Sequence, residues 1–202
     1  MKFDAKDYPL LQDLENLKER NHSMLLYDNE EYAKLVKYHY IGIGLKKGEH
    51  SIILTHDDVN SIENEAASCG IDVDNFKRKK LLHIHRIENV TEQQGEIPEF
   101  KDLLRQIAVD LKPPFRFIGR VIPDVSTEVG MQLELDIEHK FHSEWENHDC
   151  SFLCTYAIND IEESKRSMWL SKLLENHHHL IYATDPVNSV SFEPNLLETF
   201  RD

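Results

Sequence analysis

Glycine and proline are scarce in this chain, and each occurs seven times among its 202 residues. So little of either excludes collagen-like and low-complexity sequences, and 40% hydrophobic with 30% charged residues excludes a disordered chain. The length fits one domain, or one domain with an appendage. No run approaches the roughly 18 apolar residues of a membrane-spanning helix. Residues 1–7 also lack the apolar core of a signal peptide.

Basic residues are few as well: 23 lysines and arginines stand against 37 aspartates and glutamates, which gives a formal net charge of −14. A chain this acidic repels phosphate backbones and anionic lipids. We therefore expect neither nucleic acid nor a membrane as a direct partner. The three cysteines cannot all pair within one chain, so we expect reduced thiols in a cytoplasmic protein.

Short apolar runs alternate along the chain with segments of helical periodicity. The apolar runs predict strands at residues 23–27, 51–55, 81–85, 115–122, 151–156 and 179–183. Apolar residues at helical spacing predict helices at residues 10–17, 29–45, 59–69, 97–111, 127–147 and 161–175. Part of segment 127–147 also alternates like a strand, but its length favours a helix, because strands rarely exceed about 10 residues.

This alternation predicts an α/β fold with three layers, in which helices flank a mostly parallel sheet of five to six strands. The strands lack a clean polar–apolar alternation, as expected for a sheet that is buried on both faces. We assign residues 1–20 to an N-terminal helical extension, 21–186 to the α/β domain and 187–202 to a C-terminal tail.

The first predicted turn between a strand and a helix, residues 27–32, has no glycine and three carboxylates. A phosphate-binding loop needs glycines, which let backbone N–H groups approach the phosphate, and usually a lysine. Carboxylates at a helix N-terminus stabilise the helix but repel a phosphate. No Gly-x-Gly-x-x-Gly segment follows a predicted strand either. We therefore predict no nucleotide binding, no ATPase activity and no cofactor.

Ligands of parallel α/β sheets bind near the carboxyl ends of the strands. The predicted ligand-binding residues accordingly lie in or after the predicted strands: Tyr27, Asp28, His56, Asp57, His85, Arg120, Cys154 and Tyr156.

Two kinds of residue in this set have alternative interpretations. Arg120 shares an apolar predicted strand with Arg116, and a charge there needs a partner. Either arginine forms an ion pair with an acidic neighbour, or Arg120 anchors a carboxylate ligand. Cys154 is either a small buried residue or a thiol that contacts the ligand, and Tyr156 then lines the same pocket.

Histidine is frequent, with 12 residues, but the chain has no His-Glu-x-x-His or Cys-x-x-Cys motif. We therefore interpret the histidines as structural or surface residues, and we predict no metal site and no catalytic residue. The alternative is that His56, Asp57 and His85 meet at the strand ends.

Five short motifs resemble a known family in their order and spacing. They are His22–Tyr27 (HSMLLY), Glu30–Tyr32 (EEY), Gly44–Glu49 (GLKKGE), Cys154–Tyr156 (CTY) and Leu173–His177 (LLENH). Together they resemble the MEDS domain, a sensory domain named for methanogens, methylotrophs and the regulator of dichloromethane dehalogenase.

The resemblance runs from about residue 22 to 186, and it implies a RecA/KaiC-like fold that has lost its phosphate loop. It further implies a non-enzymatic sensory domain of an archaeal or bacterial cell, which binds a small organic ligand and often acts in transcription regulation. Such domains are often linked to a DNA-binding or kinase module. This chain carries neither, so we expect the signal to pass to a separate regulator or kinase protein.

Two other functions stay open on the sequence. One is an enzyme that uses His56, Asp57, His85 and Cys154 in the same cleft. The other is a protein-interaction module, such as a homodimer formed through the N-terminal helix and through residues 128–149, which hold seven acidic residues and one lysine.

Overall fold

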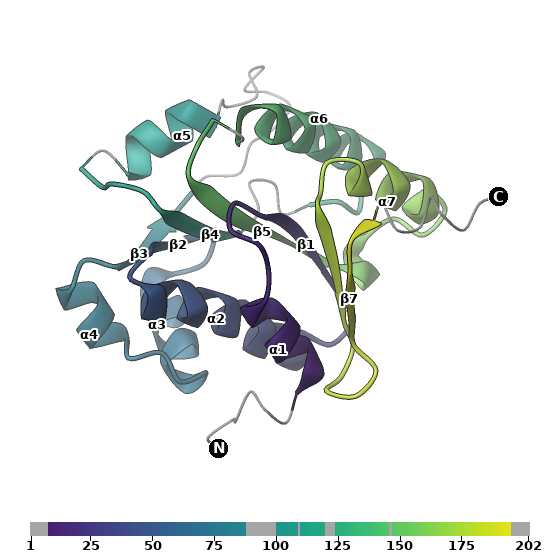
Figure 1. The fold of residues 1–202 in the computed structure, drawn as a ribbon. Coiled ribbons are helices and arrows are strands. Elements are labelled where there is room, and N and C mark those ends of the chain that lie inside the picture. The colour runs from purple at the N-terminus through teal and green to yellow at the C-terminus, as the bar shows by residue number, and fades with distance from the viewer. Residues whose placement is uncertain (1–7, 88–99, 109, 120–123, 146, 195–202) are drawn as a thin grey trace.

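The computed structural model describes residues 8–87, 100–108, 110–119, 124–145 and 147–194. These residues form a three-layer α/β fold, in which a seven-stranded sheet lies between two layers of helices (Figure 1). The predicted fold class is confirmed. No helix in the described ranges combines the length and the apolar character that crossing a bilayer requires.

The strands of the sheet run in the order β3-β2-β4-β5-β1-β6-β7. Their bounds are β1 His22–Tyr27, β2 His50–Thr55, β3 Leu82–Arg86, β4 Phe115–Gly119, β5 Cys150–Ala157, β6 His179–Ala183 and β7 Val190–Phe192. All neighbouring strands pair in parallel except β6 and β7, which pair antiparallel. The sheet therefore has one strand more than predicted.

The additional strand β7 lies in the segment that we assigned to the C-terminal tail. It is only three residues long, and its side chains are exposed or half-buried. Its alternation of Val190, Ser191 and Phe192 is too short to indicate a strand by itself, and the segment becomes a strand because the edge of β6 offers it hydrogen bonds.

Seven α-helices and one 3-10 turn cover the two faces of the sheet in the described ranges. They are α1 Pro9–Glu15, α2 Glu30–Lys47, α3 Val59–Ser68, α4 Val73–Arg78, α5 Phe100–Ile107, α6 Glu128–Trp145, the turn η3 Ile158–Asp160 and α7 Arg166–Leu174. Helices α1 to α4 lie on one face, and α5 to α7 lie on the other (Figure 1). Each layer has its own hydrophobic core against the sheet.

The ends of the long helix α2 follow from its sequence. The side chain of Asn29 accepts a hydrogen bond from the backbone N–H of Tyr32 and caps the first turn. Gly48 ends the helix in a left-handed conformation with a φ of 81°, which glycine adopts without steric cost. Helix α1 packs on α2 through the buried residues Leu10, Leu11 and Leu14.

A buried ion pair joins α2, β2 and β4. The guanidinium of Arg116 binds Glu49 with two hydrogen bonds, of 2.6 Å from Nε and 3.1 Å from Nη2. It also lies over the ring of Tyr40, 4.5 Å from the ring centroid. Both charged residues are buried, so the interpretation of Arg116 as an ion-pair partner is confirmed.

Removing the carboxylate of this pair should destabilise the fold strongly. We expect Glu49→Ala to lower the free energy of unfolding by about 3–5 kcal/mol, because it leaves a buried guanidinium without its partner. The exposed pair of Lys18 and Glu193 is the matched control, and Glu193→Ala should cost less than about 1 kcal/mol. Urea unfolding followed by circular dichroism measures both, and equal losses would contradict the expectation.

Candidate functional site

A cavity of about 310 Å³ opens at the carboxyl ends of the central strands, on the face covered by α2 and α3. The ends of β1, β2, β4 and β5 form its floor, and the first half of α2 and helix α3 form one wall. Its residues with polar side chains or at strand ends are Tyr27, Glu30, Lys37, Tyr38, Thr55, His56, Asp57, Glu65, Gly119, Thr155, Ala157 and Asp160. This is the edge of the sheet at which parallel α/β folds bind ligands.

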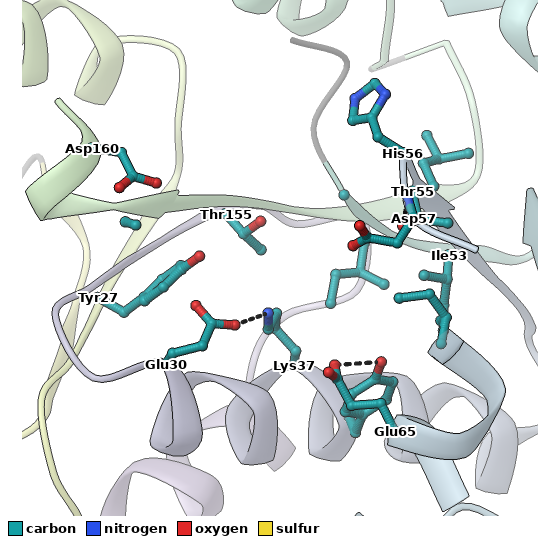
Figure 2. Close-up of a pocket in the computed structure, with 16 residues that line it drawn as sticks. Tyr27, Glu30, Lys37, Ile53, Thr55, His56, Asp57, Glu65, Thr155 and Asp160 are labelled. Carbon is teal, nitrogen blue, oxygen red and sulfur yellow. Dashed lines mark hydrogen bonds and ion pairs between the residues drawn. The ribbon is translucent and has the colours of Figure 1, made fainter. Parts of the chain in front are cut away.

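The lining of the cavity is acidic. It contains the carboxylates of Glu30, Asp57, Glu65 and Asp160, and Lys37 is its one lysine. The ammonium of Lys37 lies 3.2 Å from a carboxylate oxygen of Glu30, so that lysine is already engaged. Figure 2 shows Glu30 and Lys37 together at the centre of the cavity, with Asp57 and Asp160 on its two sides. Counting histidine as neutral, the cavity carries more negative than positive charge.

Two tyrosines add aromatic surface and hydroxyl groups to the cavity. The hydroxyl of Tyr38 donates a hydrogen bond of 2.8 Å to Glu65. Burial and the neighbouring Glu65 carboxylate raise the pKa of Tyr38 above its ordinary value of 10, so this hydroxyl stays protonated. The ring of Tyr27 lies 5.6 Å from the ammonium of Lys37, in cation–π contact.

The turn between β1 and α2 occupies the position where a phosphate loop would lie. It consists of Asp28 and Asn29 alone. The side-chain oxygen of Asn29 accepts the N–H of Tyr32 at 3.1 Å, and Glu30 and Glu31 begin the helix. The side chain of Asn29 therefore already binds one of the backbone N–H groups that a phosphate would use. The carboxylates of Glu30 and Glu31 belong to the same first turn of the helix, where they would repel a phosphate.

Three of the eight predicted ligand-binding residues line this cavity: Tyr27, His56 and Asp57. The ring of His56 points away from Lys37 (Figure 2), and its Nδ1 lies 3.0 Å from the carbonyl oxygen of Ile87. Arg120 lies outside the described residues.

The other four predicted residues lie elsewhere. The carboxylate of Asp28 accepts a hydrogen bond of 3.2 Å from the hydroxyl of Tyr182. His85 lies on β3 beside His83, with the two ring centroids 6.4 Å apart. Cys154 and Tyr156 belong to the core of the opposite face, under α6 and α7. The cavity is instead lined by Thr155 and Ala157, which alternate with these two residues along β5.

Sequence reasoning missed Glu30, Lys37, Glu65 and Asp160. Glu30 was considered as a residue that excludes phosphate and as part of a family motif, but not as a residue of a ligand site. Lys37 and Glu65 lie inside helices, where a charged residue looks like part of a solvent-exposed face. Helical spacing identifies the face of α2 that these residues share, but it does not show that this face turns toward the strand ends.

A model of the family described as "MEthanogen/methylotroph, DcmR Sensory domain" matches residues 21–185. The chain belongs to the MEDS family. The family is one of sensory domains, and the resemblance inferred from the five sequence motifs is confirmed. No curated protein sequence is similar enough to the chain to count as a match.

Two solved structures illustrate the fold that this chain shares with known proteins. A KaiC-like protein from the hyperthermophilic archaeon Pyrococcus horikoshii OT3 has a TM-score of 0.57 and 11% sequence identity, over 87% of this chain and 77% of that one. A second protein of the same organism has a TM-score of 0.50 and 14% identity, over 87% of this chain and 88% of that one. At such identities the likeness shows that this MEDS domain has a RecA/KaiC-like fold and nothing more.

The half-buried histidines of β3 should make the stability of this MEDS domain sensitive to pH. Burial lowers the pKa of His83 and His85 below the ordinary 6.5. At a pH between the ordinary pKa of the unfolded chain and the lower pKa of the folded protein, the unfolded chain binds more protons than the folded one. The folded protein therefore loses stability as the pH falls through this range. We expect a lower urea midpoint at pH 5 than at pH 7.5, and a smaller difference between the two in His83→Gln. An unchanged difference in this variant would contradict the expectation.

Proposed function

We propose that this MEDS domain senses a small organic molecule, uncharged or positively charged, that binds in the cavity at the carboxyl ends of the strands. The observation that carries the proposal is the composition of the lining, which combines four carboxylates and two tyrosines with one lysine. A cavity of about 310 Å³ fits a small ligand.

The charges favour this class of ligand over anions. In the described structure, Glu30 pairs with Lys37, and Glu65 accepts the hydroxyl of Tyr38. Asp57 and Asp160 have no ion pair among the described residues, and both are exposed. They are the groups that an ammonium of a ligand would meet first, and a carboxylate or phosphate would be repelled by the same groups.

Passage of the signal to a separate regulator or kinase protein is the second part of the proposal. It rests on the sensory character of the family and on the position of the cavity. A ligand in the cavity would contact α2 and α3 together with the ends of four strands. Ligand binding would therefore shift the outer helices relative to the sheet, and a partner protein would recognise this change.

The fold does not bring together the four residues of the enzyme alternative. His56 and Asp57 line the cavity, but Cys154 lies on the opposite face of the sheet and His85 is not in the lining. Nucleophile and base must lie within hydrogen-bond reach for covalent catalysis, and these four side chains do not meet. We therefore propose a sensor without catalytic activity.

Magnesium ATP should not bind to this protein. The glycine-free turn at Asp28 and Asn29 offers no cradle for phosphates, and Glu30 and Glu31 repel them. Calorimetric titration from micromolar to millimolar nucleotide should give no saturable heat, with a phosphate-loop ATPase as the positive control. Saturable binding would show that the acidic turn does not exclude nucleotides.

A matched series of small ligands tests the charge preference of the cavity. We expect propylamine to raise the thermal midpoint more than propanol, and propionate to have no effect. The variant Asp57→Asn should weaken amine binding about two- to fivefold, because it removes one exposed charge partner. Asp74→Asn, on helix α4, is the control for lost surface charge.

Two results would refute this ligand preference. One is tighter binding of the carboxylate than of the amine at low ionic strength. The other is equal loss of amine binding in Asp57→Asn and Asp74→Asn, because the effect would then come from the net charge of the protein rather than from the cavity.

A further inference from the structure

A second group of chemically reactive side chains lies on the opposite face of the sheet, away from the cavity. It consists of His22 at the start of β1, Glu138 on α6, Cys154 on β5 and His177 in the turn between α7 and β6. All four residues are buried, with exposed fractions of 3 to 4%. Hydrophobic residues of the core under α6 and α7 surround them.

One atom of each residue points into the same small volume. The four atoms are Nε2 or Nδ1 of the histidines, an oxygen of Glu138 and Sγ of Cys154, and all lie within 4.8 Å of one another. Nε2 of His22 is 3.2 Å from Oε2 of Glu138 and 3.3 Å from Sγ of Cys154. Nε2 of His177 is 3.7 Å from the same carboxylate oxygen.

These separations match the edges of a tetrahedron around a metal ion. Zinc binds nitrogen and oxygen at about 2.0–2.2 Å and thiolate sulfur at about 2.3 Å, which places neighbouring ligand atoms roughly 3.3–3.8 Å apart. The three measured separations lie in or next to this range. A slight movement of side chains would therefore suffice to hold an ion among the four atoms.

The contacts around the four residues orient them toward this centre. Nδ1 of His177 lies 2.8 Å from the carbonyl oxygen of Leu173, so it carries the hydrogen and Nε2 presents its lone pair to the centre. The hydroxyl of Tyr156 donates to Oε1 of Glu138 at 2.7 Å and leaves Oε2 facing inward. Metal ligands commonly have such outer hydrogen bonds, which fix the histidine tautomer and the carboxylate orientation.

One of the inward atoms, Nε2 of His177, has no hydrogen bond among the described residues, and its side chain is fully buried. With Nδ1 of His177 protonated, Nε2 is an acceptor, and it lies 3.7 Å from Oε2 of Glu138, which is an acceptor too. Oε2 has His22 as its ion-pair partner at 3.2 Å, but Nε2 of His177 is left without a donor. A buried acceptor that faces a second acceptor is unfavourable unless a cation lies between them.

We propose that His22, Glu138, Cys154 and His177 form a binding site for a divalent transition-metal ion, and that zinc is the ion they fit best. Two imidazoles, a carboxylate and a thiolate suit zinc better than calcium or magnesium, which prefer oxygen ligands. Zinc balances the charges of one carboxylate and one thiolate, and the thiol proton leaves to solvent on binding. Four protein ligands close the coordination sphere, as in structural sites.

The ligands come from four separate elements. Metal binding would join β1, β5, α6 and the turn after α7, and so fasten α6 to the sheet. This site is independent of the proposed ligand cavity, which lies on the other face. It departs from our sequence-based expectation that the protein has no metal site.

Zinc binding by the untagged full-length protein tests the proposal. After treatment with a chelator, the protein should take up one zinc equivalent per chain in a competition titration, and its thermal midpoint should rise on addition of one equivalent. Cobalt in place of zinc should give the visible bands of a tetrahedral ion and a near-ultraviolet absorption from the thiolate. These measurements need no variant, so they do not depend on the folding of a mutant.

Variants then assign the site. Cys154→Ser should remove the thiolate-to-cobalt absorption, and His177→Gln should weaken zinc binding at least about 100-fold. Tyr156→Phe keeps all four ligands but removes the outer hydrogen bond to Glu138, so we expect a loss of roughly 10–100-fold. Cys150→Ser changes a buried cysteine four residues away on the same strand, outside the cluster, and should bind zinc as tightly as the unchanged protein.

Two outcomes would overturn the proposal. The first is that the wild-type protein binds neither zinc nor cobalt with a Kd below about 10 µM. The cluster would then be only a buried pair of His22 and Glu138, with Cys154 and His177 as its neighbours. If zinc binds but Cys154→Ser keeps the near-ultraviolet absorption and His177→Gln keeps its affinity, the ion lies at another site. Circular dichroism spectra of the variants identify any that fail to fold, and the measurements on the unchanged protein then decide.

Discussion

Burial of the central strands on both faces is the constraint on which the rest of this structure depends. Side chains along β1 and β5 point alternately to the two helical layers, so adjacent residues serve different sites. Thr155 lines the acidic cavity under α2, while Cys154 and Tyr156 point to the core under α6. One strand thus supplies residues to the acidic cavity on one face and to the four-residue cluster on the other.

The acidic turn after β1 disfavours a phosphate at the edge of the sheet where the cavity lies. In this fold the carboxyl end of the first strand meets the N-terminus of the following helix, which is a favourable place for a phosphate. Here Asn29 caps the helix and Glu30 pairs with Lys37. The same edge of the sheet forms a cavity, and its lining is acidic. The proposed sensing of small uncharged or cationic molecules rests on that acidic lining.

Local sequence signals predicted most of the fold. Six strands and the long helices were predicted because each depends on hydrophobic periodicity within a short stretch of the chain. The seventh strand was missed because the apolar pattern of β7 spans only three residues and the strand depends on the edge of β6. The candidate site was predicted in part, because the rule that ligands bind at strand ends gave Tyr27, His56 and Asp57 but not which helix faces them.

The sequence by itself determined the class of fold, the absence of a phosphate loop and the family, since these depend on the order of residues along the chain. Tertiary structure decided which side chains meet. His22 and Cys154 are 132 residues apart in the chain, and they come together because β1 and β5 pair in parallel. Glu138 and His177 join them only because α6 and the turn after α7 cover that face. Hydrophobic periodicity identifies the buried face of each helix and strand. It does not show which other elements pack against that face, and this packing brings the four side chains of the cluster together.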